Sequence, residues 1–186
     1  MASPSLNPLL VAEDSDEDFE VLELLMQQMQ VQQPIHRCTN GDKVLDFVYQ
    51  DGESGEPRSV PLPSVILLDL NLPGTDGREV LEQLKQNQSF REIPIVVFTT
   101  SSNPKDIEFC YQNGANGYLI KPVDLEELER TVQAFVNYWL QANIPPITGS
   151  VVNDYRVSSH IPFPPLAPRR RPSSPSQNLT HFSSRL

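Results

Sequence analysis

The chain has 186 residues, which is enough for one well-buried domain and too few for two of comfortable size. Its 14 basic and 24 acidic side chains give a formal net charge of -10, and this argues against a general nucleic-acid binder because phosphate contacts need clustered cations. Cys38 and Cys110 lack the CxxC or histidine spacing of a metal site or disulfide framework, so we expect buried, reduced thiols.

The sequence carries no signal for targeting or membrane insertion. Residues 1–10 lack a basic region followed by a long apolar core, so no signal peptide is predicted. No apolar run approaches the roughly 18 residues that a membrane helix needs. We therefore expect a cytoplasmic protein with no membrane partner.

In the first half of the chain, short apolar runs alternate with segments of helical period. The run at 65–68 is apolar at every position, which is typical of an inner strand of a parallel sheet covered on both faces. The stretch at 51–63 is rich in Gly and Pro and predicts a loop. The elements predicted in this half are a strand at 9–11, a helix at 18–29, a strand at 35–39, a helix at 42–49 and a strand at 65–68.

The same alternation continues to about residue 140. Asp124 is predicted to cap the last helix, and acidic residues follow it near the positive end of the helix dipole. The other elements predicted in this part are a helix at 78–85, a strand at 93–98, a helix at 104–112 and a strand at 118–120. The inward face of the last helix is predicted to carry Leu125, Leu128, Val132, Phe135 and Trp139.

Strands and helices that alternate at this spacing predict parallel strands joined by right-handed crossovers, and therefore a doubly wound α/β fold. Residues 1–140 carry a net charge of -14, whereas residues 141–186 carry +4 and hold 8 of the 18 prolines. We therefore predict a domain at 1–142 and a disordered Pro/Ser-rich tail at 143–186. The arginines at 169–171 are interpreted as a solvated feature of this tail.

Polar side chains follow four of the predicted strands, at the edge of an open parallel sheet where ligands bind. They are Glu13 and Asp14 after the first strand, Asp69 after the third, Thr99 after the fourth and Lys121 after the fifth. Each of them alone has an ordinary explanation as a cap, strand or loop residue. Their coincidence at successive strand ends predicts one site.

The chemistry of these side chains favours phosphoryl transfer. Two carboxylates about 4 Å apart repel by about 4 kcal/mol at an effective dielectric near 20, so three of them need a cation or raised pKa values. Hard oxygen ligands suit Mg²⁺, and an adjacent lysine and hydroxyl suit a transferred phosphoryl group. Asp69 is the preferred acceptor because it ends the most buried predicted strand.

These residues, in this order, resemble the signature of the response-regulator receiver domain of two-component signalling: Glu13-Asp14, Leu67-Leu68-Asp69, Thr99 and Lys121-Pro122. The resemblance covers about residues 6–142 and implies a flavodoxin-like, five-stranded sheet of order 2-1-3-4-5. The segments ILLDLNLPGTDGREVLEQLK and FTTS resemble the small receivers that serve cyanobacterial and bacterial phytochromes. The implied protein is a phosphoprotein of a phosphorelay whose only reactions are its own phosphorylation and dephosphorylation, so it is not an enzyme with a separate substrate.

The resemblance also implies a role for each residue of the site. Asp69 would accept the phosphoryl group from a phosphohistidine, and Lys121 would pair with a phosphoryl oxygen. Thr99 would hydrogen-bond the phosphoryl group, and Tyr118 would turn inward as Thr99 moves. The Lys121–Pro122 peptide bond is expected to be cis. The implied ligands of Mg²⁺ are Glu13, Asp14, Asp69 and the backbone carbonyl of Asn71.

The implied partner is a sensor histidine kinase, with phytochromes as the expected class. Its predicted docking surface is the first helix, near Phe19, Leu22 and Met26, together with the loop after the last strand. No DNA-binding output domain is expected, so the signal would pass by protein contact. A homodimer is predicted through the fourth helix, fifth strand and fifth helix, with apolar surface from Phe109, Tyr111, Tyr138 and Trp139.

Two other functions stay open on the sequence alone. A small-molecule phosphatase with an aspartate nucleophile usually carries a second aspartate two residues further on, where this chain has Asn71. A phosphorylation-independent adaptor would keep the fold and lose the chemistry, and the intact set of polar residues at the strand ends argues against it. Turnover of a phosphate ester and labelling by acetyl phosphate with Mg²⁺ discriminate among the three functions.

Overall fold

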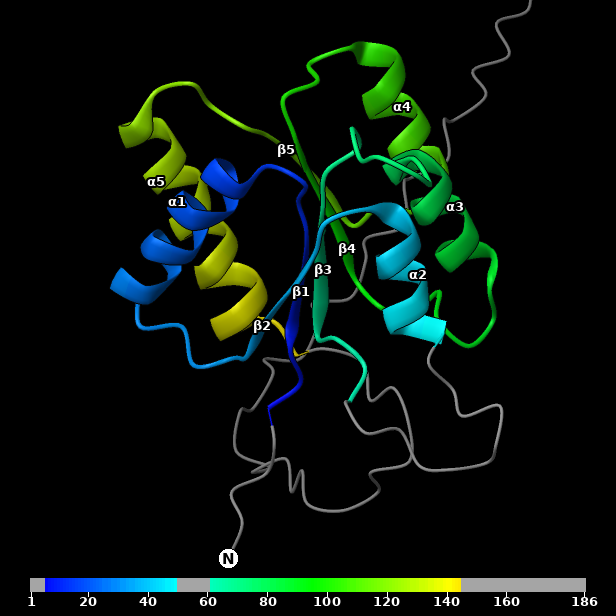
Figure 1. Ribbon diagram of the computed structural model, residues 1–186, viewed down its shortest axis with the longest axis horizontal. Helices are drawn as coiled ribbons and strands as arrows, with labels where there is room; N and C mark the ends of the chain where they lie inside the picture. Colours follow the sequence, from blue (N-terminus) through cyan, green and yellow to red (C-terminus); the bar gives the residue numbers. More distant parts are fainter. Residues whose placement is uncertain (1–5, 50–60, 145–186) are drawn as a thin grey trace, which may run out of the picture. The chain divides into compact units, whose positions relative to one another are not determined.

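A computed structural model describes residues 6–49 and 61–144, in which five parallel strands form one sheet (Figure 1). The strand order is β2-β1-β3-β4-β5, which confirms the predicted fold class and order. The predicted boundary at residue 142 stays a prediction, because nearly all of the predicted tail lies outside the described residues. The strands are β1 (Leu9–Ala12), β2 (Ile35–Cys38), β3 (Val65–Leu68), β4 (Ile95–Thr99) and β5 (Gly117–Ile120).

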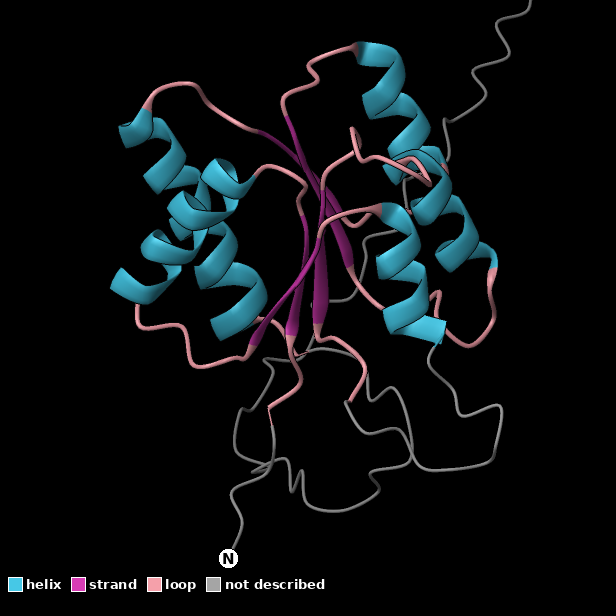
Figure 2. Ribbon diagram, in the orientation of Figure 1, coloured by secondary structure: helices cyan, strands magenta, loops and turns pink. Residues whose placement is uncertain are grey.

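Helices cover both faces of the sheet. Figure 2 shows α1 and α5 on one face and α2, α3 and α4 on the other. None of the helices within the described ranges is long and apolar enough to cross a membrane. The helices are α1 (Asp16–Gln28), α2 (Gly41–Tyr49), α3 (Gly77–Gln86), α4 (Pro104–Gln112) and α5 (Leu125–Phe135), which continues into the π-helical segment η1 (Val136–Ala142).

Two apolar clusters fill the spaces between the sheet and its helices. Successive residues of a strand point to opposite faces, so Leu10 of β1 packs with residues of α2 and α3, and Leu9 packs with residues of α1 and α5. Burial of one such side chain contributes about 1.5–3 kcal/mol. Cys38 and Cys110 are free and buried, as predicted, and burial raises the pKa of each thiol to about 11. Strands β1 and β3 are apolar at every position because both of their faces are covered.

Side-chain caps fix where the helices begin beyond the carboxyl edge of the sheet. Ser15, Asp76, Asn103 and Asp124 each accept a hydrogen bond from a backbone N–H in the first turn of α1, α3, α4 and α5. Each such cap is worth about 1 kcal/mol. The cap at Asp124 was predicted and is confirmed. The caps at Ser15 and Asp76 explain why α1 and α3 begin slightly before their predicted starts.

Some details of the predicted elements are wrong. Strand β4 begins at Ile95 and not at residue 93, because Pro94 has no N–H to give to the sheet. Leu125 is 62% exposed, since it lies in the first turn of α5 and at the border of the apolar stripe. The Lys121–Pro122 peptide bond is trans and not cis, and trans is the lower-energy form of such bonds. The other residues predicted on the inward face of the last helix belong to or pack against the apolar cluster between the sheet and helices α1 and α5: Leu128, Val132, Phe135 and Trp139.

Arg78 joins α3 to α4 through a half-buried ion pair. Its Nη2 and Nε donate to the Asp106 carboxylate at 2.9 and 3.1 Å, and its Nη1 donates to the cap residue Asp76 at 3.1 Å. Ser101, in the loop between β4 and α4, donates its hydroxyl to the same Asp106 carboxylate at 2.6 Å. These hydrogen bonds, led by the one from Arg78, lower the pKa of Asp106. The network therefore holds the β4–α4 loop against α3.

The first residue of α3 has room for glycine alone. A Cβ on Gly77 would lie 2.1 Å from the backbone oxygen of Asp69, whereas one on Gly117 would meet a Val96 methyl group at 3.5 Å. We expect Gly77→Ala to lower the free energy of unfolding by roughly 1–3 kcal/mol, because the backbone has to shift. Urea unfolding of this variant beside the matched control Gly117→Ala measures the effect, and equal stabilities would contradict it.

The Arg78–Asp106 pair predicts a pH dependence of stability. A carboxyl group whose pKa is lowered in the folded state contributes stability above its unfolded pKa, and this is lost as pH falls through the folded value. We therefore expect Asp106→Asn to be less stable than the wild type at pH 7, with the difference shrinking below about pH 4. Urea unfolding as a function of pH measures this. Glu126 forms an exposed ion pair with Arg130 and provides the control Glu126→Gln. We expect this variant to differ little from the wild type in stability at every pH.

Candidate functional site

Backbone hydrogen bonds extend the sheet by one residue at its carboxyl edge and place the predicted site residues there. The N–H of Glu13 donates to Cys38 O at 3.0 Å, and the N–H of Asp69 donates to Ala12 O at 3.0 Å. The N–H of Lys121 donates to Thr99 O at 2.8 Å. These residues are therefore held as firmly as the strands that precede them.

The Lys121 ammonium group lies at the centre of this edge. Its Nζ is 2.5 Å from Glu13 Oε2 and 2.6 Å from Asp69 Oδ2, and the Lys121 side chain is only 8% exposed. A third carboxylate, that of Asp18 in α1, accepts from the same Nζ at 3.1 Å. The structure thus brings together Glu13, Asp69 and Lys121, which the sequence predicted.

Burial and charge act in opposite directions on this group of residues. Burial raises the pKa of Glu13, and the hydrogen bond from Lys121 only partly opposes it. Burial by itself would lower the pKa of Lys121, but the hydrogen bonds and charges of Asp69 and Glu13 outweigh it, so the pKa lies above its ordinary value. Lys121 is therefore a cation at neutral pH. Since three carboxylates face this one ammonium group, the site favours additional positive charge.

Two hydrogen-bond donors fix the orientation of the Asp69 carboxylate. Its Oδ1 accepts from the N–H of Asn71 at 3.0 Å, while its Oδ2 accepts from Lys121. The Asp69 residue is only 6% exposed, and Asn71 beside it is exposed to solvent. Asp69 is thus a rigid carboxylate that lies at the rim of the sheet.

Thr99 and Tyr118 lie on the side of the site that adjoins α4. Thr99 is fully buried, and its hydroxyl oxygen accepts from the N–H of Ser101 at 3.4 Å and from the amide of Asn71 at 3.5 Å. The Tyr118 hydroxyl donates to Ser101 O at 2.9 Å, and its ring packs against the apolar cluster between the sheet and helices α2 and α3. Both side chains therefore contact the same loop between β4 and α4.

Asp14 stands apart from the other predicted ligands. It is exposed, and within residues 6–49 and 61–144 no three His, Cys, Asp or Glu side chains are grouped so that they could hold a metal ion. The buried carboxylates of Glu13 and Asp69 still provide two hard oxygen donors, and both of them face the Lys121 ammonium group. This donor set fits a cation such as Mg²⁺, which retains several of its waters.

The predicted kinase-docking residues of α1 are not all available at the surface. Leu22 is 4% exposed and Met26 is fully buried, so neither can form a docking surface, and this part of the prediction is wrong. They point toward the sheet because they lie on the apolar stripe of α1. Phe19 is half-buried beneath the Arg37 guanidinium, whose carbon lies 4.8 Å from the centre of its ring.

Two residues near the site escaped prediction from the sequence. Asp18 belongs to an acidic first turn of α1, which the helix dipole alone explains. Arg37 lies on β2, and its side chain reaches the loop between β1 and α1. No sequence motif marks either residue, because only the packing of α1 and β2 beside β1 brings them to the site.

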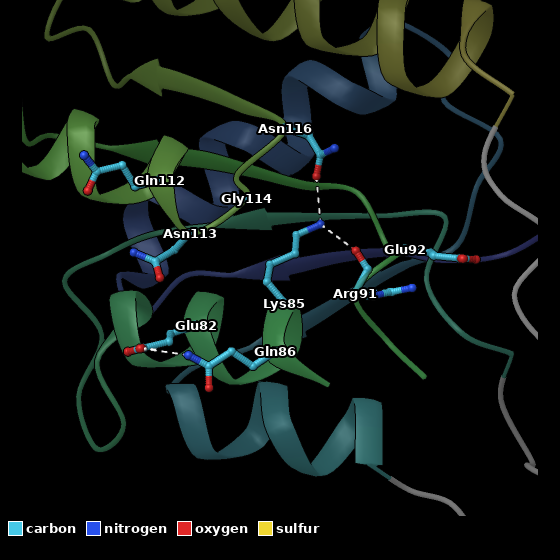
Figure 3. A pocket seen from close by; sticks show the side chains of 9 residues that line it. All are labelled: Glu82, Lys85, Gln86, Arg91, Glu92, Gln112, Asn113, Gly114 and Asn116. Atoms are coloured by element: carbon cyan, nitrogen blue, oxygen red, sulfur yellow. Dashed lines mark hydrogen bonds between the residues drawn. The ribbon is translucent and has the colours of Figure 1, made fainter. Parts of the chain in front are cut away.

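A polar pocket of about 540 Å³ lies at the opposite edge of the sheet, around Lys85 (Figure 3). At its centre, Lys85 donates to the backbone oxygens of Arg91 and Ile93 and to Asn116 Oδ1, at 3.1, 2.7 and 2.9 Å. Burial lowers the pKa of Lys85 to about 8. All three ammonium hydrogens thus have protein acceptors, so Lys85 joins α3 to the starts of β4 and β5 and is no anion site.

Comparison with known proteins identifies the family. The response regulator receiver domain family matches residues 9–133. The response regulator Rcp1 of Synechocystis sp. is 37% identical over 133 residues, which cover 72% of this chain and 88% of that protein. The probable methanogenesis regulatory protein FilR2 of Methanothrix harundinacea is 38% identical over 138 residues, which cover 74% of this chain and 86% of that protein.

Solved structures agree with this match. The Mn(2+)-bound form of Rcp1 has a TM-score of 0.69 and 36% identity, and the similarity covers 75% of this chain and 99% of that chain. The phosphorylated cyanobacterial phytochrome response regulator RcpA also has a TM-score of 0.69, with 30% identity over 76% of this chain and 99% of that chain. This chain therefore belongs to the response regulator receiver domain family of two-component signalling.

Proposed function

We propose that this protein accepts a phosphoryl group on Asp69 from the phosphohistidine of a sensor kinase and signals by contact with other proteins. The observation that carries the proposal is the buried Lys121 ammonium group, which is bonded to both Asp69 and Glu13. The carboxylate of Asp69 is an oriented nucleophile, and the ammonium group beside it can stabilise charge on a transferred phosphoryl group.

In the proposed reaction, one carboxylate oxygen of Asp69 attacks the phosphorus atom of the phosphohistidine. A bond between this oxygen and phosphorus forms as the bond from phosphorus to the imidazole nitrogen breaks, and the nitrogen keeps the electron pair. Lys121 pairs with a phosphoryl oxygen, and the Thr99 hydroxyl donates a hydrogen bond to another. The product is an acyl phosphate on Asp69.

The proposed cofactor is Mg²⁺, held by Glu13, Asp14, Asp69 and the backbone carbonyl of Asn71, partly through water. The surplus of carboxylates around Lys121 supports this assignment, and the Mn(2+)-bound form of the similar Rcp1 agrees with it. When bound, the ion would neutralise negative charge on the phosphoryl oxygens. The exposure of Asp14 suits a ligand that acts through water.

Phosphorylation is proposed to act through Thr99 and Tyr118. It replaces the single negative charge of the Asp69 carboxylate with roughly two negative charges on the phosphoryl oxygens, which draw the Thr99 hydroxyl toward them. The Thr99 oxygen and the Tyr118 hydroxyl both bond to Ser101, and the hydroxyl of Ser101 bonds to Asp106 of α4. Movement of Thr99 would therefore shift the β4–α4 loop and change the surface that α4 presents.

A phytochrome is the kinase class we propose, because RcpA, a cyanobacterial phytochrome response regulator, is among the similar structures. The docking surface is revised to exposed apolar residues of α1 and of the segment that follows β5. Val123 and Leu125, in and just after the loop that follows β5, are exposed, and Leu24 on the outer face of α1 is 54% exposed. These side chains replace the buried Leu22 and Met26.

The two alternative functions have less support. A phosphatase of the aspartate type needs an acid to protonate the leaving group, and Asn71 cannot supply a proton in this way. An adaptor without phosphorylation would not need buried carboxylates around an ammonium group, an arrangement that costs desolvation energy.

Incubation with acetyl phosphate and Mg²⁺, followed by mass spectrometry, tests the proposal. We expect the wild type to gain the mass of one phosphoryl group, and we expect Asp69→Asn or addition of a chelator to abolish the gain. Asp46→Asn, which removes an exposed aspartate of α2, is the matched control and should label like the wild type. A wild type that gains no mass would favour the adaptor, and steady turnover of a generic phosphate ester would favour the phosphatase.

We also propose that two copies of the chain associate through α4, β5 and the end of the last helix. Strand β5 is an edge strand, and Ile120 at its end is 44% exposed. Tyr111 and Tyr138 are 54% and 57% exposed, as a contact surface requires. Phe109 and Trp139, also predicted for this surface, pack against the two apolar clusters and contribute less to it.

Light scattering at high protein concentration tests this association. We expect twice the mass of one chain for the wild type and the mass of one chain for Ile120→Lys, because a buried, unpaired charge at the contact costs several kcal/mol. Leu24→Lys places the same charge on the outer face of α1 and should leave the dimer intact. A wild type of single-chain mass at all concentrations would overturn the proposal.

A further inference from the structure

Arg37 binds the loop between β1 and α1, which carries Glu13 and Asp14. Its Nε donates to the backbone oxygen of Glu13 at 3.0 Å, and its Nη2 donates to the backbone oxygen of Asp14 at 3.1 Å. Its Nη1 pairs with Asp16 at 2.6 Å, and its guanidinium group lies over the ring of Phe19. These four contacts of the Arg37 side chain are all made with one segment, residues 13–19.

These contacts fix the part of the loop that the sheet no longer holds. The last backbone bond of this loop with β2 is the one from the N–H of Glu13 to Cys38 O. Beyond it, the carbonyl groups of Glu13 and Asp14 are bound by the planar fork of Arg37, whose donors have fixed relative positions. The Arg37 side chain is 19% exposed, so solvent screens these bonds only in part. The guanidinium group therefore fixes the backbone from which both acidic side chains project, while the Ser15 N–H and Lys121 bind the Glu13 carboxylate itself.

We infer that Arg37 is a positioning residue that raises the affinity of the acidic loop for a divalent cation. The inference rests on the proposed function, because it assumes that Glu13 and Asp14 bind such a cation. Arg37 reaches the loop through backbone carbonyl groups and not through the carboxylates of residues 13 and 14. It therefore orders the ligands without competing for their oxygens, as residues behind metal ligands commonly do.

If Arg37 acts only through its charge, its removal should change the Mg²⁺ affinity in the opposite direction to that expected if it positions the loop. An arginine near a cation site repels the cation, so loss of its charge alone would tighten Mg²⁺ binding. Loss of the two carbonyl contacts frees the loop, so binding would weaken. The sign of the change in affinity thus separates a positioning role from a purely electrostatic one, and an unchanged affinity indicates a purely structural role.

Calorimetric titration of the full-length protein with Mg²⁺, without any phosphoryl donor, tests the inference. We expect Arg37→Ala to raise the Mg²⁺ dissociation constant by about tenfold, within the range found for residues behind metal ligands. Arg37→Lys keeps the charge but cannot span both carbonyl groups, so it should also bind Mg²⁺ more weakly. Arg130→Ala removes an exposed arginine paired with Glu126 and should bind as the wild type does.

Arg37→Lys keeps the inference testable if Arg37→Ala does not fold. Urea unfolding establishes that each variant is folded. Affinity that is unchanged or tighter in folded Arg37→Lys and Arg37→Ala would overturn the inference while leaving the proposed function intact. A wild type that binds no Mg²⁺ at all would overturn the proposed metal site and the inference with it. Weaker binding in both variants, with Arg130→Ala unchanged, is the result that supports Arg37 as a positioning residue.

Discussion

The ammonium group of Lys121, shared by the carboxylates of Glu13 and Asp69, is the interaction on which the rest of the site depends. Removal of each of these charges from water costs several kcal/mol, and the cost is offset only when the charges meet in good geometry. Here the geometry comes from β1, β3 and β5, whose ends are fixed by backbone bonds one residue beyond the strands. The sheet is therefore the means by which three side chains far apart in sequence meet at one point.

Two loops adjoin the site around the Lys121 ammonium group, and each is bound to a different part of the fold. On one side, Glu13 and Asp14 belong to a loop that β2 holds through the side chain of Arg37. On the other side, Thr99 adjoins a loop that is bonded to α3 and α4 through Ser101, Asp106 and Arg78. A change of charge at Asp69 would therefore act between a loop anchored by Arg37 and a loop linked to the outer helices, which is a suitable arrangement for a signalling domain.

The fold could be predicted from the sequence to a large extent, because its determinants are local. Apolar runs such as 65–68 identify strands buried on both faces, and Asp124 marks a helix start by its own side-chain bond. The meeting of Glu13, Asp69 and Lys121 could also be predicted, since parallel strands bring their carboxyl ends to one edge whatever their separation in sequence. The predictions were wrong at the ends of elements. Strand β4 begins after Pro94, and Leu125 is exposed because it lies in the first turn of α5.

The sequence by itself determined the order of the elements, the apolar faces and the chemical types at the strand ends. Only the tertiary structure decided which polar side chains meet: that Asp18 joins the Lys121 cluster and that Asp14 stays exposed. It also decided that Arg37 reaches the acidic loop and that Arg78 links two helices. The physical reason is that such contacts depend on which elements lie side by side in the fold and on the reach of long polar side chains, neither of which the apolar periodicity encodes.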